Sequence, residues 1–155
     1  MGINNLTYSA NGLSLTEKFE GFRSAAYRDQ VGVWTIGYGH TGPDVVSGRT
    51  ITPAQAQALL AKDVGIAVVC VNTLVTVKIS QQEFDALVDF VFNLGIGAFK
   101  GSTMLRNLNA GDFTSAAAQF DLWDRAGGAV VAGLLRRRQT EESLFQADDG
   151  STESA

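Results

Sequence analysis

Three short patterns of the form Ser/Thr-x-x-Glu/Gln mark predicted helix starts along this 155-residue chain, beginning at Ser14, Thr52 and Ser80. In such a capping box the first side chain accepts a hydrogen bond from a backbone amide of the first turn, and the side chain three residues later reaches back. Apolar residues at helical spacing follow each box. The chain is therefore predicted to be built mainly from amphipathic helices.

Glycines and single capping residues set the remaining helix limits. Gly21 should end the first helix and Gly95 the third, and Ser102 and Asp112 should start later ones. The expected helices run from Ser14 to about Gly21, for about twenty residues after Thr52, from Ser80 to Gly95, from Ser102 to about Leu108, from Asp112 to about Trp123, and over 132–146.

The stretch from Ala26 to Gly39 departs from this helical pattern, because aromatic and β-branched residues alternate there with glycine. It predicts a small β-hairpin or three-stranded ribbon. Strand alternation would place Trp34 and Ile36 on one face, and Thr35 and Gly37 on the other. Helices with one small ribbon near the N-terminus make the expected fold class α+β.

The composition suits one soluble domain over residues 1–147 and excludes several classes of protein. That part of the chain carries 13 acidic and 12 basic residues, too balanced for a non-specific nucleic-acid binder. The polar tail at 148–155 is expected to be disordered. One cysteine, Cys70, and one histidine leave no metal site to propose, and no cofactor is expected. No apolar run approaches the roughly 18 residues of a membrane span, and the polar N-terminus is not a secretory signal.

The chemistry is concentrated in Glu20-x8-Asp29-x5-Thr35. Hydrolysis of a glycosidic bond needs an acid for the leaving oxygen and a second carboxylate across the sugar, which either activates water or attacks directly. At a helix end beside phenylalanines, Glu20 could have a raised pKa and act as the acid. Asp29 lies in a turn and should be ionised, and Thr35 can help to position water. The spacing alone also occurs by chance.

Three motifs in register resemble the phage-type lysozymes, the endolysins of glycoside hydrolase family 24. They are E-x8-D-x5-T followed by IGYGHT, the block FNLGIGAFKGSTMLRNLNAGD at 92–112, and WDRAGG with GLLRRR at 123–138. The resemblance implies a muramidase that cuts the β-1,4 bond between N-acetylmuramic acid and N-acetylglucosamine with inversion. It makes Glu20 the general acid, Asp29 the base that activates water, and Thr35 their partner.

The same resemblance implies saccharide contacts at Thr41, Phe92, Asn93 and Ser102. It also brings an arginine of the run 136–138 toward the catalytic acid, and Arg137 is the residue that we select. Phe92 and Ser102 have structural readings as well, as a core residue and a helix cap. For Asn93, a polar residue in an apolar segment, a sugar amide could supply the partner that a buried amide needs.

His40 is expected to be structural rather than catalytic. The resemblance pairs it with Asp63 on the long helix, and such a pair would raise the pKa of His40. A formal GxGxxG match at Gly37–Gly42 is rejected as a dinucleotide site, because Pro43 and a loop follow it instead of a helix.

The resemblance finally implies a lysozyme-like fold, with two lobes around a cleft and a long helix that bridges them. The expected partner is the peptidoglycan glycan strand, with no nucleic acid and no membrane insertion. The protein is expected to be a monomer that waits in the host cytoplasm for a separate permeabilising partner such as a holin. A virion-associated lysozyme and a catalytically silent cell-wall-binding module stay open as alternatives.

Overall fold

The computed structural model describes residues 3–126 and 129–147 of the chain. The tail at 148–155, predicted to be disordered, and the glycine pair at 127–128 lie outside the described residues. The chain divides into two compact units. One is formed by Leu13–Gly65, and the other combines the N-terminal segment up to Gly12 with the chain from Ile66 onward.

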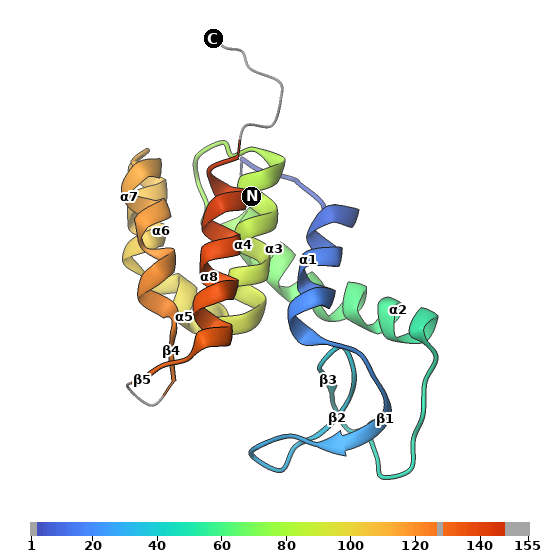
Figure 1. Ribbon diagram of the computed structural model, residues 1–155. Coiled ribbons are helices and arrows are strands. Elements are labelled where there is room, and N and C mark those ends of the chain that lie inside the picture. Colours follow the sequence, from blue (N-terminus) through green and yellow to red (C-terminus); the bar gives the residue numbers. More distant parts are fainter. Residues whose placement is uncertain (1–2, 127–128, 148–155) are drawn as a thin grey trace. The chain divides into compact units, whose positions relative to one another are not determined.

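The unit Leu13–Gly65 contains the small sheet. Helix α1 (Ala10–Glu20) leads into it, and strands β1 (Arg23–Arg28), β2 (Trp34–Gly37) and β3 (His40–Thr41) follow, with α2 (Pro53–Asp63) after a loop. The strands pair antiparallel in the order β1-β2-β3 (Figure 1). Because residues paired directly across strands share a face, Tyr27 and Thr41 lie on the face of Thr35.

The opposite face of the sheet forms the core of this unit. Ile36 is fully buried and packs with apolar residues from the loop and from α2, and Trp34 and Tyr38 cover the cluster. The buried members are Ile36, Val45, Ile51 and Ala56. The predicted face of Trp34 and Ile36 is therefore confirmed. The predicted face of Gly37 is wrong, because a Cβ there would stand 3.0 Å from Ile51 Cδ1 and 3.1 Å from the Ala56 Cβ in this same core, at a φ of +66° that departs from strand geometry.

The other unit is helical. Its elements are α3 (Gly65–Leu74), α4 (Gln81–Leu94), α5 (Ile96–Lys100), α6 (Thr103–Asn109), α7 (Phe113–Ala118), the 3₁₀ helix η1 (Phe120–Trp123), β4 (Arg125–Ala126), β5 (Ala129–Val130) and α8 (Ala132–Phe145). Helices α4 and α8 lie side by side (Figure 1). The ring of Phe90 on α4 meets Phe99, Phe120 and Trp123 edge-on and joins α4 to the shorter helices.

Four predicted helix starts and two predicted helix ends, at Gly21 after α1 and at Gly95 after α4, are confirmed. Thr52 and Ser80 each form a complete capping box. The side chains of Ser102 and Asp112 accept from the amides of Leu105 and Ser115. Gly95 ends α4 with φ +97°, a backbone angle that side chains disfavour. The fold class, α+β with a small antiparallel sheet, is confirmed as well.

The predicted start of the first helix is wrong. Helix α1 begins at Ala10, four residues before Ser14, and its cap is Ser9, whose hydroxyl oxygen accepts from the Gly12 amide at 3.0 Å. Ser9 also donates its hydroxyl proton to the buried carboxylate of Asp85. This long-range partner selects Ser9 over the local Ser14 pattern.

Three other helix predictions need correction. The predicted helix of about twenty residues is present as Pro53–Leu74, but a one-residue irregularity at Val64 divides it into α2 and α3. The residues between Gly95 and Ser102, where no helix was predicted, form the short helix α5. The helix expected from Asp112 to Trp123 is α7 followed by η1, which has the tighter 3₁₀ winding.

The segment Pro53–Leu74 is long and apolar enough to cross a membrane, by length and composition only, whereas no apolar run of that length was expected. One such helix is weak evidence, because buried helices of soluble proteins meet the same requirement.

Candidate active site

The carboxylate of Glu20 lies against the backbone of Gly39. Glu20 is the last residue of α1, and Gly39 lies in the turn between β2 and β3. A Cβ atom on Gly39 would stand 2.7 Å from Glu20 Oε1, too close for two non-bonded atoms. Gly39 also has φ +78°, which disfavours any side chain. The absent side chain at Gly39 thus makes room for the carboxylate of the predicted general acid.

Asp29 is held by the turn that it begins. Its Oδ1 accepts hydrogen bonds from the backbone amides of Val31 and Val33, each at 2.9 Å. The backbone closes the same turn, because the Asp29 amide donates to the Val33 carbonyl. One carboxylate oxygen is thereby fixed in place. The other, Oδ2, has no hydrogen-bond partner within the described residues and can accept from a water molecule.

Thr35 is linked to Asp29 through one residue. The Thr35 hydroxyl donates to the Val33 carbonyl at 2.9 Å, while the Val33 amide donates to Asp29. The oxygen of the hydroxyl keeps its lone pairs and can accept a hydrogen bond. Thr35 is only 4% exposed, so little bulk solvent competes for this position. Asp29 and Thr35 are therefore ordered by the same backbone, as a pair that positions water requires.

His40 lies between two carboxylates. Its Nδ1 is 2.7 Å from Asp63 Oδ2 on α2, and its Nε2 is 3.0 Å from Asp44 Oδ2. Arg49 in turn contacts Asp44 at 2.6 Å. Burial works against protonation of the ring, but the two carboxylates outweigh it, so the pKa of His40 lies above its usual value. With both ring nitrogens engaged, His40 ties β3 to the long loop and to α2.

The predicted saccharide-binding residues fall in both units. Thr41 is exposed at the end of β3 in the unit Leu13–Gly65, and Phe92 and Asn93 are half-buried on α4 in the other. Ser102 is buried and uses its hydroxyl inside the protein, because it donates to the Phe99 carbonyl and accepts from the Leu105 amide. It therefore caps α6.

Arg137 is engaged in a buried ion pair. Its Nε and Nη2 donate to the two carboxylate oxygens of Asp89 at 2.9 and 2.8 Å, and Asp89 is fully buried. Such a two-pronged contact fixes the guanidinium plane. Arg136 is exposed on the same helix.

Two groups of residues that sequence reasoning missed complete these networks. Asp44 and Arg49 extend the His40 pair, and the spacing of four residues between His40 and Asp44 was the available signal. Arg138 and Glu141 are fully buried on α8. Burial, and then the proximity of Asp89, raise the pKa of Glu141 well above its usual value.

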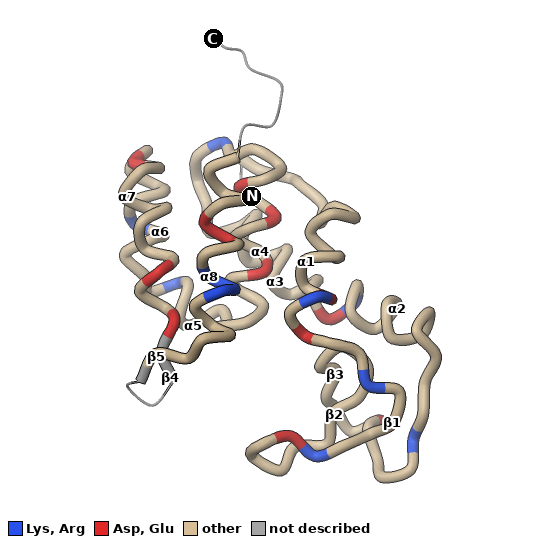
Figure 2. The backbone as a smooth tube through the Cα atoms, viewed as in Figure 1, with Lys and Arg blue, Asp and Glu red and all other residues tan. Residues whose placement is uncertain are grey.

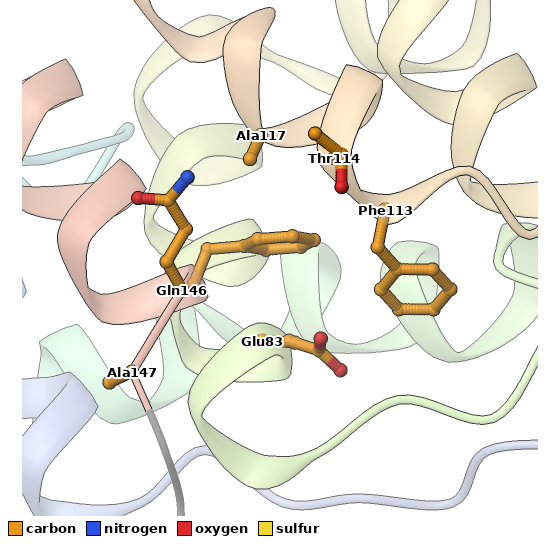
Figure 3. A pocket seen from close by; sticks show the side chains of 7 residues that line it. Glu83, Phe113, Thr114, Ala117, Gln146 and Ala147 are labelled. Atoms are coloured by element: carbon orange, nitrogen blue, oxygen red, sulfur yellow. The ribbon is translucent and has the colours of Figure 1, made fainter.

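Two other features of the described residues do not resemble a catalytic site. Within residues 3–126 and 129–147, no group of three or more His, Cys, Asp or Glu residues is placed to hold a metal ion. A pocket of about 240 Å³ opens between α7 and the end of α8 (Figure 3). Phe113 and Phe145 line it with Glu83 as its one charged group, so it holds no acid and base pair.

Charges of both signs are spread along the chain (Figure 2).

The chain matches known proteins over most of its length. The family model Phage lysozyme matches residues 17–141. An endolysin of Bacillus phage B103 is 44% identical over 90% of this chain, which spans 54% of that relative's own length. An endolysin of Acyrthosiphon pisum secondary endosymbiont phage 1 is 40% identical over 90% of this chain and 97% of its own. The solved muramidase domain of SpmX from Asticaccaulis excentricus superposes with a TM-score of 0.88 at 42% identity, over 93% of this chain and all of its own. By sequence and by structure, the chain belongs to the phage lysozyme family.

Proposed function

We propose that this protein is an endolysin muramidase, a glycoside hydrolase that cuts the β-1,4 bond between N-acetylmuramic acid and N-acetylglucosamine in peptidoglycan. Membership of the phage lysozyme family supports the reaction class. The observation that carries the assignment of residues is the placement of Glu20 over the bare backbone of Gly39, in the same unit as the Asp29 and Thr35 pair.

In the proposed mechanism, Glu20 transfers its proton to the glycosidic oxygen as the bond to the anomeric carbon breaks. Asp29 Oδ2 accepts a proton from a water molecule that the Thr35 hydroxyl helps to orient. The water oxygen bonds to the anomeric carbon from the face opposite the leaving sugar. Each turnover leaves Glu20 deprotonated and Asp29 protonated, and exchange with solvent restores both.

Inversion is part of this proposal. Attack by water on the face opposite the leaving group converts the β bond into an α product, and it needs carboxyl groups roughly 6.5–9.5 Å apart. A nucleophilic Asp29 would instead give retention, through a covalent glycosyl intermediate. Because Oδ1 of Asp29 is occupied by two amides, water at Oδ2 is the arrangement that this turn favours.

For the wider surroundings, we propose that residues 1–147 act as one domain and that Thr41, Phe92 and Asn93 contact the glycan. Ser102 would contribute by fixing the start of α6, and Arg137 through its place in the Asp89 network. We also propose that the protein works as a monomer, accumulates in the host cytoplasm and reaches the wall after a holin-type partner permeabilises the membrane.

The experiment for the reaction is analysis of the products released from purified peptidoglycan. Proton NMR of the fresh products should show the α-anomer first, together with new reducing ends. If the β-anomer forms first, the enzyme retains the configuration and the proposed inverting mechanism is wrong. Products with anhydro ends would instead identify a lytic transglycosylase. If no products are released, the alternative of a cell-wall-binding module is supported.

A further inference from the structure

A fully buried group of charges joins α4 to α8. Asp89, Arg138 and Glu141 are each 0% exposed and Arg137 is 5% exposed. Charged groups this deep inside a protein lose their hydration, so each must be held by partners. Asp89 and Arg137 pair with each other. Arg138 and Glu141 form the other pair, and Arg138 also contacts Asn93, which is only half-buried.

Glu141, Phe90 and Asn93 contact the Arg138 guanidinium, whose Nε and Nη1 make no hydrogen bond of good geometry within the described residues. Its Nε is 2.8 Å from Glu141 Oε1, and its Nη2 donates to Glu141 Oε2 at 3.1 Å. The guanidinium carbon lies 5.0 Å from the centre of the Phe90 ring. The same Nη2 donates to Asn93 Oδ1 at 2.9 Å. The guanidinium therefore has a fixed position from which to contact Asn93.

This contact decides how the Asn93 amide is oriented. A guanidinium can only donate hydrogen bonds, so the group that faces it must be the amide oxygen and not the amide nitrogen. Asn93 Nδ2 then points away from Arg138. It has no partner within the described residues and is not enclosed by the protein. Because the positive charge of Arg138 polarises the amide, this nitrogen is also a stronger donor than that of a free asparagine.

We propose that Arg138 is a positioning residue, which fixes Asn93 so that Nδ2 is a donor for the acetamido carbonyl oxygen of an N-acetylated sugar. Glycan hydroxyls both donate and accept, so a flipping amide could serve them in either orientation. The acetamido carbonyl only accepts, so it gains from an amide whose nitrogen always faces outward. The inference rests on the proposed function, because it names what Asn93 recognises on peptidoglycan.

The first test is Asn93→Asp, because a carboxylate still accepts from Arg138 but cannot donate to substrate. Cleavage is measured on native, chemically de-N-acetylated and re-acetylated glycan strands. Wild type should lose about tenfold in kcat/KM on the de-N-acetylated strands, about the effect of one hydrogen bond, and recover on the re-acetylated ones. On native strands, Asn93→Asp should have a kcat/KM about tenfold below that of wild type, mainly because its KM is higher. Its kcat/KM should not fall further on the de-N-acetylated strands.

The matched control is Asn107→Asp, the same change at a half-buried asparagine on α6. It should keep the wild-type preference for acetylated strands.

The role of Arg138 is tested with Arg138→Met, which cannot donate a hydrogen bond to Asn93, in a Glu141→Gln background that avoids leaving a buried carboxylate without its cation. This variant should show the raised KM and the weakened preference of Asn93→Asp. Arg138→Lys, which retains a donor, should restore part of both.

The inference is overturned if Asn93→Asp keeps the wild-type KM and preference while Glu20→Gln is inactive. Wild-type activity in Glu20→Gln would instead remove the proposed catalytic role, whatever Asn93 does.

Discussion

The carboxylate of Glu20 occupies the space that a side chain at Gly39 would fill, since a Cβ there would stand 2.7 Å from Glu20 Oε1. The end of α1 and the β2–β3 turn therefore position the proposed acid together. A short side chain on the turn should displace the acid while leaving the rest of the sheet intact.

Gly39→Ala is predicted to lower activity at least tenfold, because displacement by an ångström costs much of the benefit of a positioned acid. It should also cost about 1 kcal/mol of unfolding free energy, from the φ of +78°. The matched control is Gly48→Ala, which has φ +88° but nothing within 4 Å of its added Cβ. Urea unfolding should show a similar loss for both variants, and a clearing assay should show the loss of activity only for Gly39→Ala.

Asp29→Asn should separate the contribution of Asp29 to the stability of the turn from its role as the catalytic base. The asparagine oxygen can still accept from the amides of Val31 and Val33, so the melting temperature should change little. The amide cannot take a proton from water, so activity should fall by about 10²–10⁴-fold. Asp29→Ala should lose stability as well as activity. An active Asp29→Asn would contradict the role of Asp29 as base.

The contacts of His40 predict a pH-dependent contribution to stability. Since the carboxylates of Asp63 and Asp44 raise the pKa of His40, the folded state holds the proton more tightly than the unfolded state. The contribution is full below the ordinary value of about 6.5 and is lost as pH rises through the raised pKa. NMR titration should place the His40 midpoint above about 6.5 in wild type and lower in Asp63→Asn. Urea unfolding of the two proteins should differ most at acidic pH and least at alkaline pH.

The Asp89 and Arg137 pair predicts a large penalty for breaking only one partner. Asp89→Asn should destabilise the protein by about 3–5 kcal/mol, because it removes the two-pronged counter-charge of a buried guanidinium whose contact with a second carboxylate, at Glu141 Oε2, is longer at 3.9 Å. Replacing both residues by apolar ones of similar size, Asp89→Leu with Arg137→Met, should recover much of that loss. Arg136→Met, on the exposed side of α8, should stay within about 0.5 kcal/mol of wild type. Equal costs for the single and the double variant would contradict this account.

Local patterns predicted the fold well where a feature depends on neighbouring residues. The boxes at Thr52 and Ser80 and the cap at Ser102 need only residues within one turn of helix, and all are present. Ser14 has the same local pattern, but the helix is capped by Ser9, whose partner Asp85 is 76 residues away in the sequence. No window of sequence contains that contact.

The same limit explains the charges that were missed on α8. The sequence of α8 alone gives no reason to bury charged residues completely, so it did not predict that Arg138 and Glu141 are 0% exposed. Their burial depends on α4, which supplies Asp89 and Asn93 from about 45 residues earlier. Within the site, the motif identified Glu20, Asp29 and Thr35, but the contact with Gly39 and the link through Val33 needed coordinates.

The most direct test of the central claim is the rate at which Glu20→Gln clears permeabilised Gram-negative cells, compared with wild type. Glutamine has nearly the same shape and fits over Gly39, so circular dichroism and the melting temperature should match wild type. It has no proton to give to the leaving oxygen, so clearing should slow by at least 10²-fold. Clearing at the wild-type rate would show that Glu20 is not the catalytic acid.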